Sequence, residues 1–227
     1  MERPKISCII PAFNEEPRIE GVLSAAHKHP LIDEIIVVDD CSADGTKDIV
    51  KKFEGIRLIV HEKNCGKSKA IVTGVKEASG DFLFFLDADL VGLTPKNISD
   101  LIEPVISGKA DVSISLRGNA PWQYKKIGLD FISGERVFLK RLVEAHLDKI
   151  ENLCRFGLES FLNKLIIKNR CRIKVVRWDN VESPWKSKKD GFWPGVKADI
   201  KMTMDVLRTN HVWGYFYQII RMCQLKI

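Results

Sequence analysis

Short apolar runs alternate with helical patterns through the first half of this chain, and this order constrains the fold more than any other feature. The apolar runs, which we expect to be strands, are residues 6–10, 34–39, 56–60 and 82–86. The segments between them, which we expect to be helices, are residues 19–26, 44–53 and 67–78. The runs are mainly apolar and continuous rather than alternating, which is typical of parallel strands covered on both faces of a sheet. Because right-handed crossovers bring the carboxyl ends of such strands to one edge, we expect the following loops to lie together.

The second half of the chain is less regular. The sequence predicts helices at residues 94–107, 133–147 and 157–169, and strands at residues 111–116 and 173–177. Thr94 before Pro95 is a helix-start signal, since Thr caps helices and Pro suits the first helical position. The 227 residues contain no clear linker. We therefore predict a single compact α/β domain, with a mostly parallel central sheet, helices on both faces and a C-terminal helical extension.

Charge is distributed unevenly along the chain. The net charge is +6, but residues 1–116 are acidic overall, whereas residues 117–227 are basic and contain all five tryptophans. This asymmetry predicts different roles for the two halves. The six cysteines form no CxxC pair, so we expect buried free thiols in a reducing compartment. No segment resembles a signal peptide or a membrane span of about 18–20 apolar residues. The expected location is the cytoplasm, either free or at the inner face of the membrane.

Acidic residues follow three of the predicted strands. Asn14 and Glu15 come after the first strand, Asp40 after the second, and Asp87 and Asp89 after the fourth. Carboxylates gathered at one edge repel one another unless a cation or hydrogen-bond donors lie between them. Oxygen ligands suit Mg²⁺ or Mn²⁺. Asp87 and Asp89 are the expected metal ligands; the alternative is a turn residue and a helix cap. Asp40 can accept a hydrogen bond from a nucleobase N–H, or act as a turn residue.

Lys67 stands at the start of a predicted helix. Residues 66–68 (Gly-Lys-Ser) resemble the end of a phosphate-binding P-loop, but His61 stands where that loop requires its first glycine, so we reject this match. A lysine at a helix N-terminus can still reach a diphosphate. A solvated surface lysine is the alternative.

Four motifs together resemble those of family 2 glycosyltransferases. They are residues 9–16 (Ile-Ile-Pro-Ala-Phe-Asn-Glu-Glu), 37–46 (Val-Val-Asp-Asp-Cys-Ser-Ala-Asp-Gly-Thr), 64–67 (Asn-x-Gly-Lys) and 80–90 (Gly-Asp-Phe-Leu-Phe-Phe-Leu-Asp-Ala-Asp-Leu). The resemblance implies a GT-A fold, a nucleotide-diphosphate sugar donor, a divalent metal and inversion at the anomeric carbon. It implies that residues 1–116 bind the nucleotide sugar and residues 117–227 bind the acceptor.

The resemblance also implies roles for individual residues. Those that would line the nucleoside pocket are Pro11, Asn14, Glu15 and Asp40. Lys67 would lie near the ribose or diphosphate. Asp87 would approach the ribose and the metal, and Asp89 would be the principal metal ligand and take part in catalysis through it.

The acceptor side matches two groups within this family. Residues 133–136 (Ser-Gly-Glu-Arg) are similar to the Ser-Gly-x-Arg of enzymes that glycosylate polyprenyl phosphates, and to a Gly-Glu segment of glucosyl-3-phosphoglycerate synthases. Residues 157–159 resemble the Gly-x-Glu of both groups. Glu159 would be the catalytic base for a hydroxyl acceptor, or would fix an acceptor sugar; the alternative is a Glu favoured only by the helix dipole. Arg136 would bind a phosphate acceptor as a fork.

The basic loop near residue 190 is open to several interpretations. Lys186, Lys188 and Lys189 lie between Trp185 and Trp193. They would bind a phosphate by closing over the site as a lid, contact anionic lipid headgroups, or remain solvated. Residues 212–220 are aromatic on nearly every side, as in an interfacial helix, a helix packed under the sheet or a dimer contact.

The sequence therefore predicts an inverting, metal-dependent glycosyltransferase. Its partners would be a nucleotide-diphosphate sugar and a polyprenyl phosphate or saccharide acceptor, with peripheral membrane contact and no nucleic acid. Two alternatives stay open: a haloacid-dehalogenase-type phosphatase that uses Asp87 and Asp89, and a basic membrane- or nucleic-acid-binding protein without enzyme activity. The first leaves the Asn14 and Asp40 loops unexplained, and the second lacks a known recognition motif.

Overall fold

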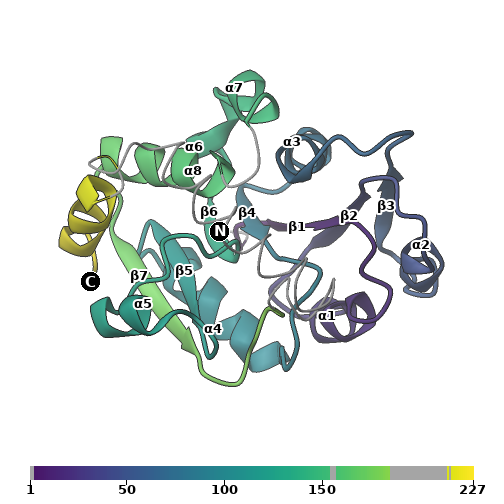
Figure 1. Ribbon diagram of the computed structural model, residues 1–227, viewed down its shortest axis with the longest axis horizontal. Helices are drawn as coiled ribbons and strands as arrows, with labels where there is room; N and C mark the ends of the chain where they lie inside the picture. Colours follow the sequence, from purple (N-terminus) through teal and green to yellow (C-terminus); the bar gives the residue numbers. More distant parts are fainter. Residues whose placement is uncertain (1–2, 154–156, 185–213, 215) are drawn as a thin grey trace, which may run out of the picture.

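A seven-stranded sheet in the order β3-β2-β1-β4-β6-β5-β7 forms the centre of the protein (Figure 1). The computed structural model describes residues 3–153, 157–184, 214 and 216–227. The strands are β1 (Ile6–Ala12), β2 (Glu34–Asp39), β3 (Arg57–Val60), β4 (Phe82–Phe85), β5 (Val112–Arg117), β6 (Arg136–Leu139) and β7 (Ile173–Trp178). The helices with named bounds are α1 (Ile19–Ala26), α2 (Thr46–Val50), α3 (Lys67–Glu77), α4 (Pro95–Ile106), α5 (Trp122–Ile127), α6 (Arg141–Glu144), α7 (Leu147–Glu151) and α8 (Gly157–Lys168).

The sheet is mostly parallel, as predicted. Only β6 runs antiparallel to its neighbours, β4 and β5; the other strand pairs are parallel. Both halves of the chain contribute to this sheet, because β6 and β7 come from residues 117–227. The carboxyl ends of β1, β2 and β4 lie next to one another at one edge, since these strands are adjacent and parallel.

Helices cover both faces of the sheet, which explains the continuous apolar runs. Ile6, Cys8 and Ile10 of β1 belong to the cluster that includes α1 and α4. Ile9 points the other way, into the cluster that includes α3 and α8. Figure 1 shows α1 and α4 on one side of the sheet, with α3 and α8 on the other. Nearly every residue of β1, β2 and β4 is buried, so these strands show no regular polar alternation in the sequence.

The helix predicted for residues 133–147 is wrong. Its first part is strand β6, and only the short helices α6 and α7 follow. Val137 packs with α1 and α4, whereas Phe138 packs with α3 and α8, which is the alternation of a strand. Both open edges, those of β4 and β5, pair with this segment. These pairings decide its conformation, and they come from residues that are distant in sequence.

The start of α4 confirms the predicted cap. The Thr94 side chain accepts from the Asn97 amide, the Asn97 side chain accepts from the Thr94 amide, and Pro95 is the first helical residue. This reciprocal pair satisfies two backbone donors that the helix itself leaves open.

The cysteine expectation holds only in part. Cys8 and Cys171 are buried, and burial raises the pKa of both thiols. Cys41, Cys65 and Cys223 are only half-buried. These five described cysteines are free thiols, and Cys154 lies outside the described residues.

The C-terminal helix, residues 216–224, lies against α8 by one face. Gln218 donates to Ser160 of α8 at 3.2 Å, and Met222 is fully buried. Phe216, Tyr217 and Ile220 are each more than half exposed. The helix therefore packs against α8 and also carries exposed apolar groups, while residues 212, 213 and 215 of the predicted aromatic segment lie outside the described residues. Within the described part of the chain, no helix has the length and apolarity needed to cross a membrane.

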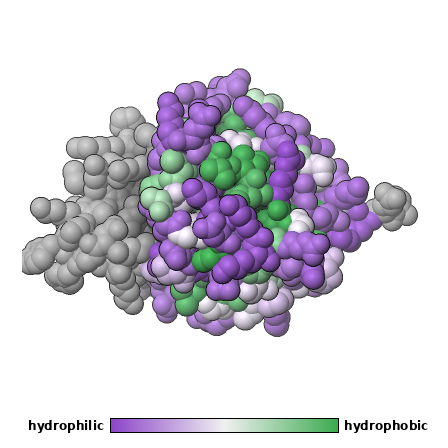
Figure 2. Space-filling view, turned by 90° about the vertical axis from the view of Figure 1, so that its right-hand side faces the viewer, coloured by the Kyte–Doolittle hydropathy of each residue, from purple (hydrophilic) through white to green (hydrophobic). Residues whose placement is uncertain are grey.

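Strand β3 forms one edge of the sheet and includes the apolar residues Leu58, Ile59 and Val60. Leu58 and Ile59 are half-buried and Val60 is 47% exposed. The side of the molecule that bears β3 and α2 shows an apolar patch surrounded by hydrophilic residues (Figure 2).

Candidate active site

The loops after β1 and β2 are joined by hydrogen bonds. Asn14 Oδ1 accepts from the Ala43 amide, and the Asn14 amide donates to Ser42 Oγ, both at 2.9 Å. The Glu15 amide donates to Thr46 Oγ1 at 2.9 Å. Asn14 adopts a φ of 53°, which Asn tolerates better than most residues. Asn14 and Glu15, expected near a nucleoside, thus hold together the two loops of this edge.

Pro11 and Glu15 lie on either side of the end of β1. Pro11 is within β1 and pairs in register with Val38 of β2. The Glu15 carboxylate accepts from the Arg18 guanidinium at 2.8 Å. Both side chains are half-buried at the edge where the sequence placed them.

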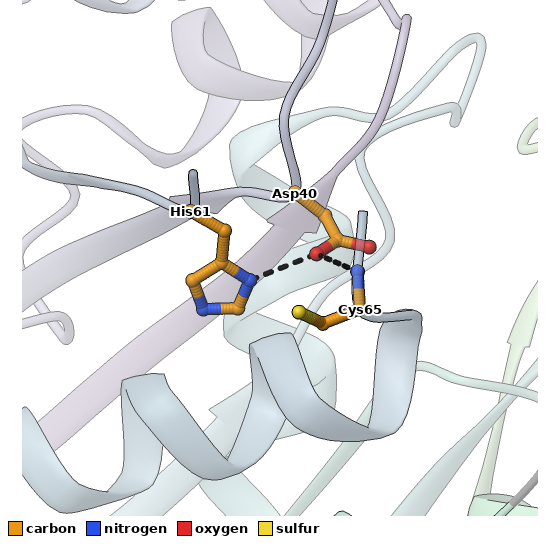
Figure 3. Close-up of side chains that lie close together, drawn as sticks. All are labelled: Asp40, His61 and Cys65. Atoms are coloured by element: carbon orange, nitrogen blue, oxygen red, sulfur yellow. Dashed lines mark hydrogen bonds and ion pairs between the residues drawn. The ribbon is translucent and has the colours of Figure 1, made fainter. Parts of the chain in front are cut away.

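Asp40 lies behind the turn that begins α3. Its Oδ1 contacts His61 Nδ1 and accepts from the Cys65 amide, both at 2.8 Å, and its Oδ2 accepts from the Gly66 amide at 2.7 Å (Figure 3). Gly66 has a φ of +90°, which favours glycine. The 5% exposed Asp40 side chain therefore fixes the turn from which Lys67 projects.

Lys67 joins two carboxylates that are far apart in sequence. Its Nζ lies 2.7 Å from Asp87 Oδ1, after β4, and 3.0 Å from Glu159 Oε1, in the first turn of α8. Burial alone would lower the pKa of Lys67, but Asp87 and Glu159 outweigh it and raise the pKa above its usual value. Lys67 is therefore a fixed positive charge, and its side chain keeps 38% exposure.

A buried ionic layer lies beneath this group. Arg117, the last residue of β5, contacts Asp130 Oδ2 at 3.1 Å and Glu135 Oε1 at 3.8 Å. Ser115 and Ser133 donate to Glu135 Oε2 at 2.6 and 2.7 Å. Burial raises the pKa of Glu135, although Arg117 opposes this effect. The sequence motifs do not include Arg117 or Asp130, and they include Glu135 only as part of the acceptor-side segment 133–136, without a role of its own. A charged residue directly after an apolar strand was the available signal for Arg117.

The prediction that Arg136 binds an acceptor phosphate is not supported by its position. Arg136 is fully buried, and its guanidinium donates to the carbonyls of Phe131 (2.7 Å) and Ser133 (2.8 Å) and to Asn163 Oδ1 (2.6 Å). These contacts occupy Nε and both terminal nitrogens of the guanidinium group. Arg136 is therefore a structural cation beneath the site. Its side chain belongs to β6, and strand alternation turns it inward.

Asp89 and Asp87 have different surroundings at the end of β4. Asp89 Oδ2 accepts from Ser183 Oγ at 3.1 Å, in the segment after β7. Gly134 lies against Asp87 so closely that a Cβ there would meet the Asp87 carboxylate at 2.5 Å. Glycine is needed at residue 134 because a side chain would displace Asp87.

The three acidic loops do not gather around one ion. Asp40 is turned toward His61 and the amides before α3, whereas Asp87 is turned toward Lys67. Among the residues that the structure describes, the expected single cluster of carboxylates is thus two separate groups. One contains Asp40, and the other contains Asp87. Lys186, Lys188 and Lys189 lie outside those residues.

The edge formed by Asp87 and Asp89 fits a divalent cation. Their carboxylate oxygens are the hard ligands that Mg²⁺ and Mn²⁺ prefer. Acidic groups outnumber basic ones in the described network around Asp87. The acidic groups are Asp87, Asp130, Glu135 and Glu159. The basic groups are Lys67, Arg117 and Arg136. A bound cation would offset that excess of negative charge.

Comparison with known proteins identifies the family to which the sequence motifs pointed. A family model described as glycosyl transferase family 2 matches residues 7–169. The chain belongs to glycosyl transferase family 2. This membership accounts for the Asn14 and Asp40 loops, and it displaces the phosphatase and binding-protein alternatives.

Two curated relatives of this family 2 chain act on lipid phosphates, according to their names. A dolichol-phosphate mannosyltransferase from Pyrococcus furiosus is 34% identical over 150 residues, which are 61% of this chain and 42% of the relative. A UDP-N-acetylglucosamine–dolichyl-phosphate N-acetylglucosaminyltransferase from Methanococcus voltae is 32% identical over 143 residues, 55% of this chain and 56% of the relative. The chain thus spans about half the length of these relatives.

A solved structure confirms the GT-A fold. Glucosyl-3-phosphoglycerate synthase from Mycobacterium tuberculosis, crystallised with Mn²⁺, UDP and glucosyl-3-phosphoglycerate, superposes with a TM-score of 0.64. The match has 23% identity and covers 82% of this chain and 74% of that one. At this identity the likeness establishes the fold and leaves the substrate open.

Proposed function

We propose that this chain transfers a sugar, with inversion, from a nucleotide-diphosphate donor to a polyprenyl phosphate or a saccharide. The observation that carries the proposal is the contact of Lys67 with both Asp87 and Glu159 at the sheet edge. It joins a donor-side carboxylate from residues 1–116 to a candidate base from residues 117–227. In this proposal one fixed cation would lie between the two reactants of the transfer reaction.

Asp87 and Asp89 would hold Mg²⁺ or Mn²⁺ in this proposal. When bound, such an ion supplies positive charge that stabilises the departing diphosphate. Manganese accompanies UDP in the crystallised synthase. The hard-oxygen donor set of Asp87 and Asp89 supports the same class of metal here.

Lys67 would bind the diphosphate directly. Its Nζ is charged, its side chain is partly exposed, and it stands at the start of α3, where the helix N-terminus adds favourable potential for an anion. Asp40 would support it by holding the turn at Gly66. The carboxylate of Asp40 retains acceptor capacity for a nucleobase N–H, since its oxygens offer about four lone-pair sites and three are used here. Pro11, Asn14 and Glu15 would complete the nucleoside side.

Glu159 would take the proton of a hydroxyl acceptor. Its side chain is 6% exposed and its Oε1 lies 3.0 Å from Lys67 Nζ, so the carboxylate would stand next to the cation that binds the donor, where a general base is needed. A phosphate acceptor is already anionic and needs no base. Since Arg136 is buried, a phosphate would have to be bound by other cations, and Lys186, Lys188 and Lys189 remain the proposed candidates.

Binding of nucleotides tests the donor half of the proposal. In isothermal titration calorimetry, UDP or GDP is expected to bind this chain at least tenfold more tightly with Mn²⁺ than with EDTA. The reason is that the metal screens the diphosphate from Asp87 and Asp89. Absence of binding by both nucleotides, with metal present, would contradict the proposed activity.

The Glu159→Gln variant separates the two acceptor classes. With a saccharide acceptor, the rate of transfer should fall by about 10²–10⁴-fold, which is the usual value of general-base catalysis. With a polyprenyl phosphate it should change by only a few fold. The measurement is product formation by mass spectrometry, with UDP- and GDP-sugars as donors and both acceptor classes present in turn.

The matched control is Glu151→Gln, which removes a carboxylate that pairs with Lys69 at 3.3 Å on the outer side of α3. It should leave transfer unchanged for either acceptor. A wild-type rate in Glu159→Gln with a saccharide substrate would show that Glu159 is not the base.

A further inference from the structure

Three potential metal ligands of different chemistry lie together behind the start of α3. Asp40 follows β2, His61 follows β3, and Cys65 immediately precedes the Gly66–Lys67 turn. A carboxylate oxygen, an imidazole nitrogen and the Cys65 sulfur all lie within 4.8 Å of one another (Figure 3). We propose that Asp40, His61 and Cys65 form a zinc site, separate from the Asp87 and Asp89 group.

The donor set selects the metal. A thiolate, an imidazole and a carboxylate match the ligands of Zn²⁺, whereas Mg²⁺ and Mn²⁺ prefer oxygen alone. Three protein ligands leave a fourth tetrahedral position for water or another small ligand. The two groups at this sheet edge therefore differ in the metal that each prefers.

The surroundings of His61 suit a metal ligand. Its second nitrogen, Nε2, lies 3.0 Å from Thr73 Oγ1 of α3. Without metal, Nδ1–H donates to Asp40 and the Thr73 hydroxyl donates to Nε2. With Zn²⁺ on Nδ1, the ring proton moves to Nε2 and the Thr73 hydroxyl accepts it. A hydroxyl serves both states because it is donor and acceptor, and such a partner on the far nitrogen is usual for zinc-bound histidine.

The position of each ligand is already fixed by the fold. Asp40 is held by the Cys65 and Gly66 amides at 2.8 and 2.7 Å. The side chains of Asp40 and His61 are only 5% and 13% exposed, while Cys65 is half-buried and gives access from solvent. Little ordering is therefore required on binding, which favours affinity.

Zinc at this site would brace the turn that carries Lys67. The ion would link the loops after β2 and β3 to the residue two positions before Lys67. Since it binds only where the loop after β2 and the loop between β3 and α3 are brought together, it would also stabilise the folded state by mass action.

Cobalt spectroscopy tests the site directly, without nucleotide or Mn²⁺. One equivalent of Co²⁺ should give a thiolate-to-cobalt charge-transfer band that Zn²⁺ abolishes by displacement. The band should disappear in Cys65→Ser and persist in Cys223→Ser, the control for a half-buried thiol elsewhere. Thr73→Val should weaken Zn²⁺ by about 10–100-fold, the usual effect of losing a partner of a ligating histidine.

X-ray absorption of the wild-type zinc complex gives a test that needs no variant. It should show one sulfur at about 2.3 Å, and nitrogen or oxygen ligands at about 2.0–2.2 Å. A shell without sulfur, or a charge-transfer band that survives in Cys65→Ser, would overturn the proposal. So would the failure of wild-type protein to retain one equivalent of Zn²⁺ through gel filtration.

Discussion

Asp89→Asn is expected to lower kcat/KM for sugar transfer by about 10³-fold while leaving the fold intact. A catalytic metal supplies several kcal/mol of charge stabilisation, and each 1.36 kcal/mol is a factor of ten in rate. Asparagine keeps the size of the side chain and can still accept from Ser183, so the loop after β4 should retain its shape. The variant removes charge without removing that contact. The measurement is the initial rate at saturating Mn²⁺, together with the midpoint of thermal unfolding.

Asp81→Asn is the matched control for this variant. Asp81 precedes β4, at the end of the strand opposite to Asp89, and its carboxylate accepts from the Lys5 amide at 3.2 Å. It should retain the wild-type rate. If Asp89→Asn kept more than about a tenth of that rate, a loss of under 1.4 kcal/mol, Asp89 would not be the principal metal ligand.

Arg136→Met is expected to destabilise the protein by about 3–5 kcal/mol, because removing one member of a buried ionic network leaves its partners uncompensated. Glu135 is fully buried and Glu159 is nearly so, and both lie within the electrostatic reach of Arg136. The Phe131 carbonyl loses a guanidinium donor as well. The measurement is the free energy of unfolding from urea denaturation at neutral pH.

Arg172→Met tests whether this loss comes from burial. Arg172 also makes hydrogen bonds with a carboxylate, that of Asp111, but the two side chains are 51% and 41% exposed. Its removal should lower the free energy of unfolding far less than Arg136→Met does, because an exposed ion pair contributes little to stability. If Arg136→Met were as stable as the wild type and lost only transfer to polyprenyl phosphate, Arg136 would be a phosphate ligand after all.

The fold was predictable where local signals agreed with one another. The runs that form β1, β2 and β4 are mainly apolar without alternation, and the cap at Thr94 is visible as the dipeptide Thr94–Pro95. The family motifs lie in the loops that these strands end in. Polar residues are found in these motifs because backbone amides of the loops need hydrogen-bond acceptors. The side chains of Asn14 and Asp40 provide such acceptors.

The second half was predicted less well because its conformation depends on distant partners. Residues 136–139 form a strand because β4 and β5 offer open edges on either side. The sequence of this segment suits a helix as well as a strand, so periodicity alone did not decide between them.

The sequence by itself determined the α/β layering, the family and the presence of carboxylates at the ends of the strands. Continuous apolar runs and helix caps are patterns of residues close in sequence, so they can be recognised without knowledge of the fold. Only the tertiary structure decided which charges meet: Lys67 with Glu159 across 92 positions, His61 with Asp40 across 21, and Arg136 turned inward. Charge pairing depends on distance in space, and distance in space is set by the sheet order rather than by the order of the chain.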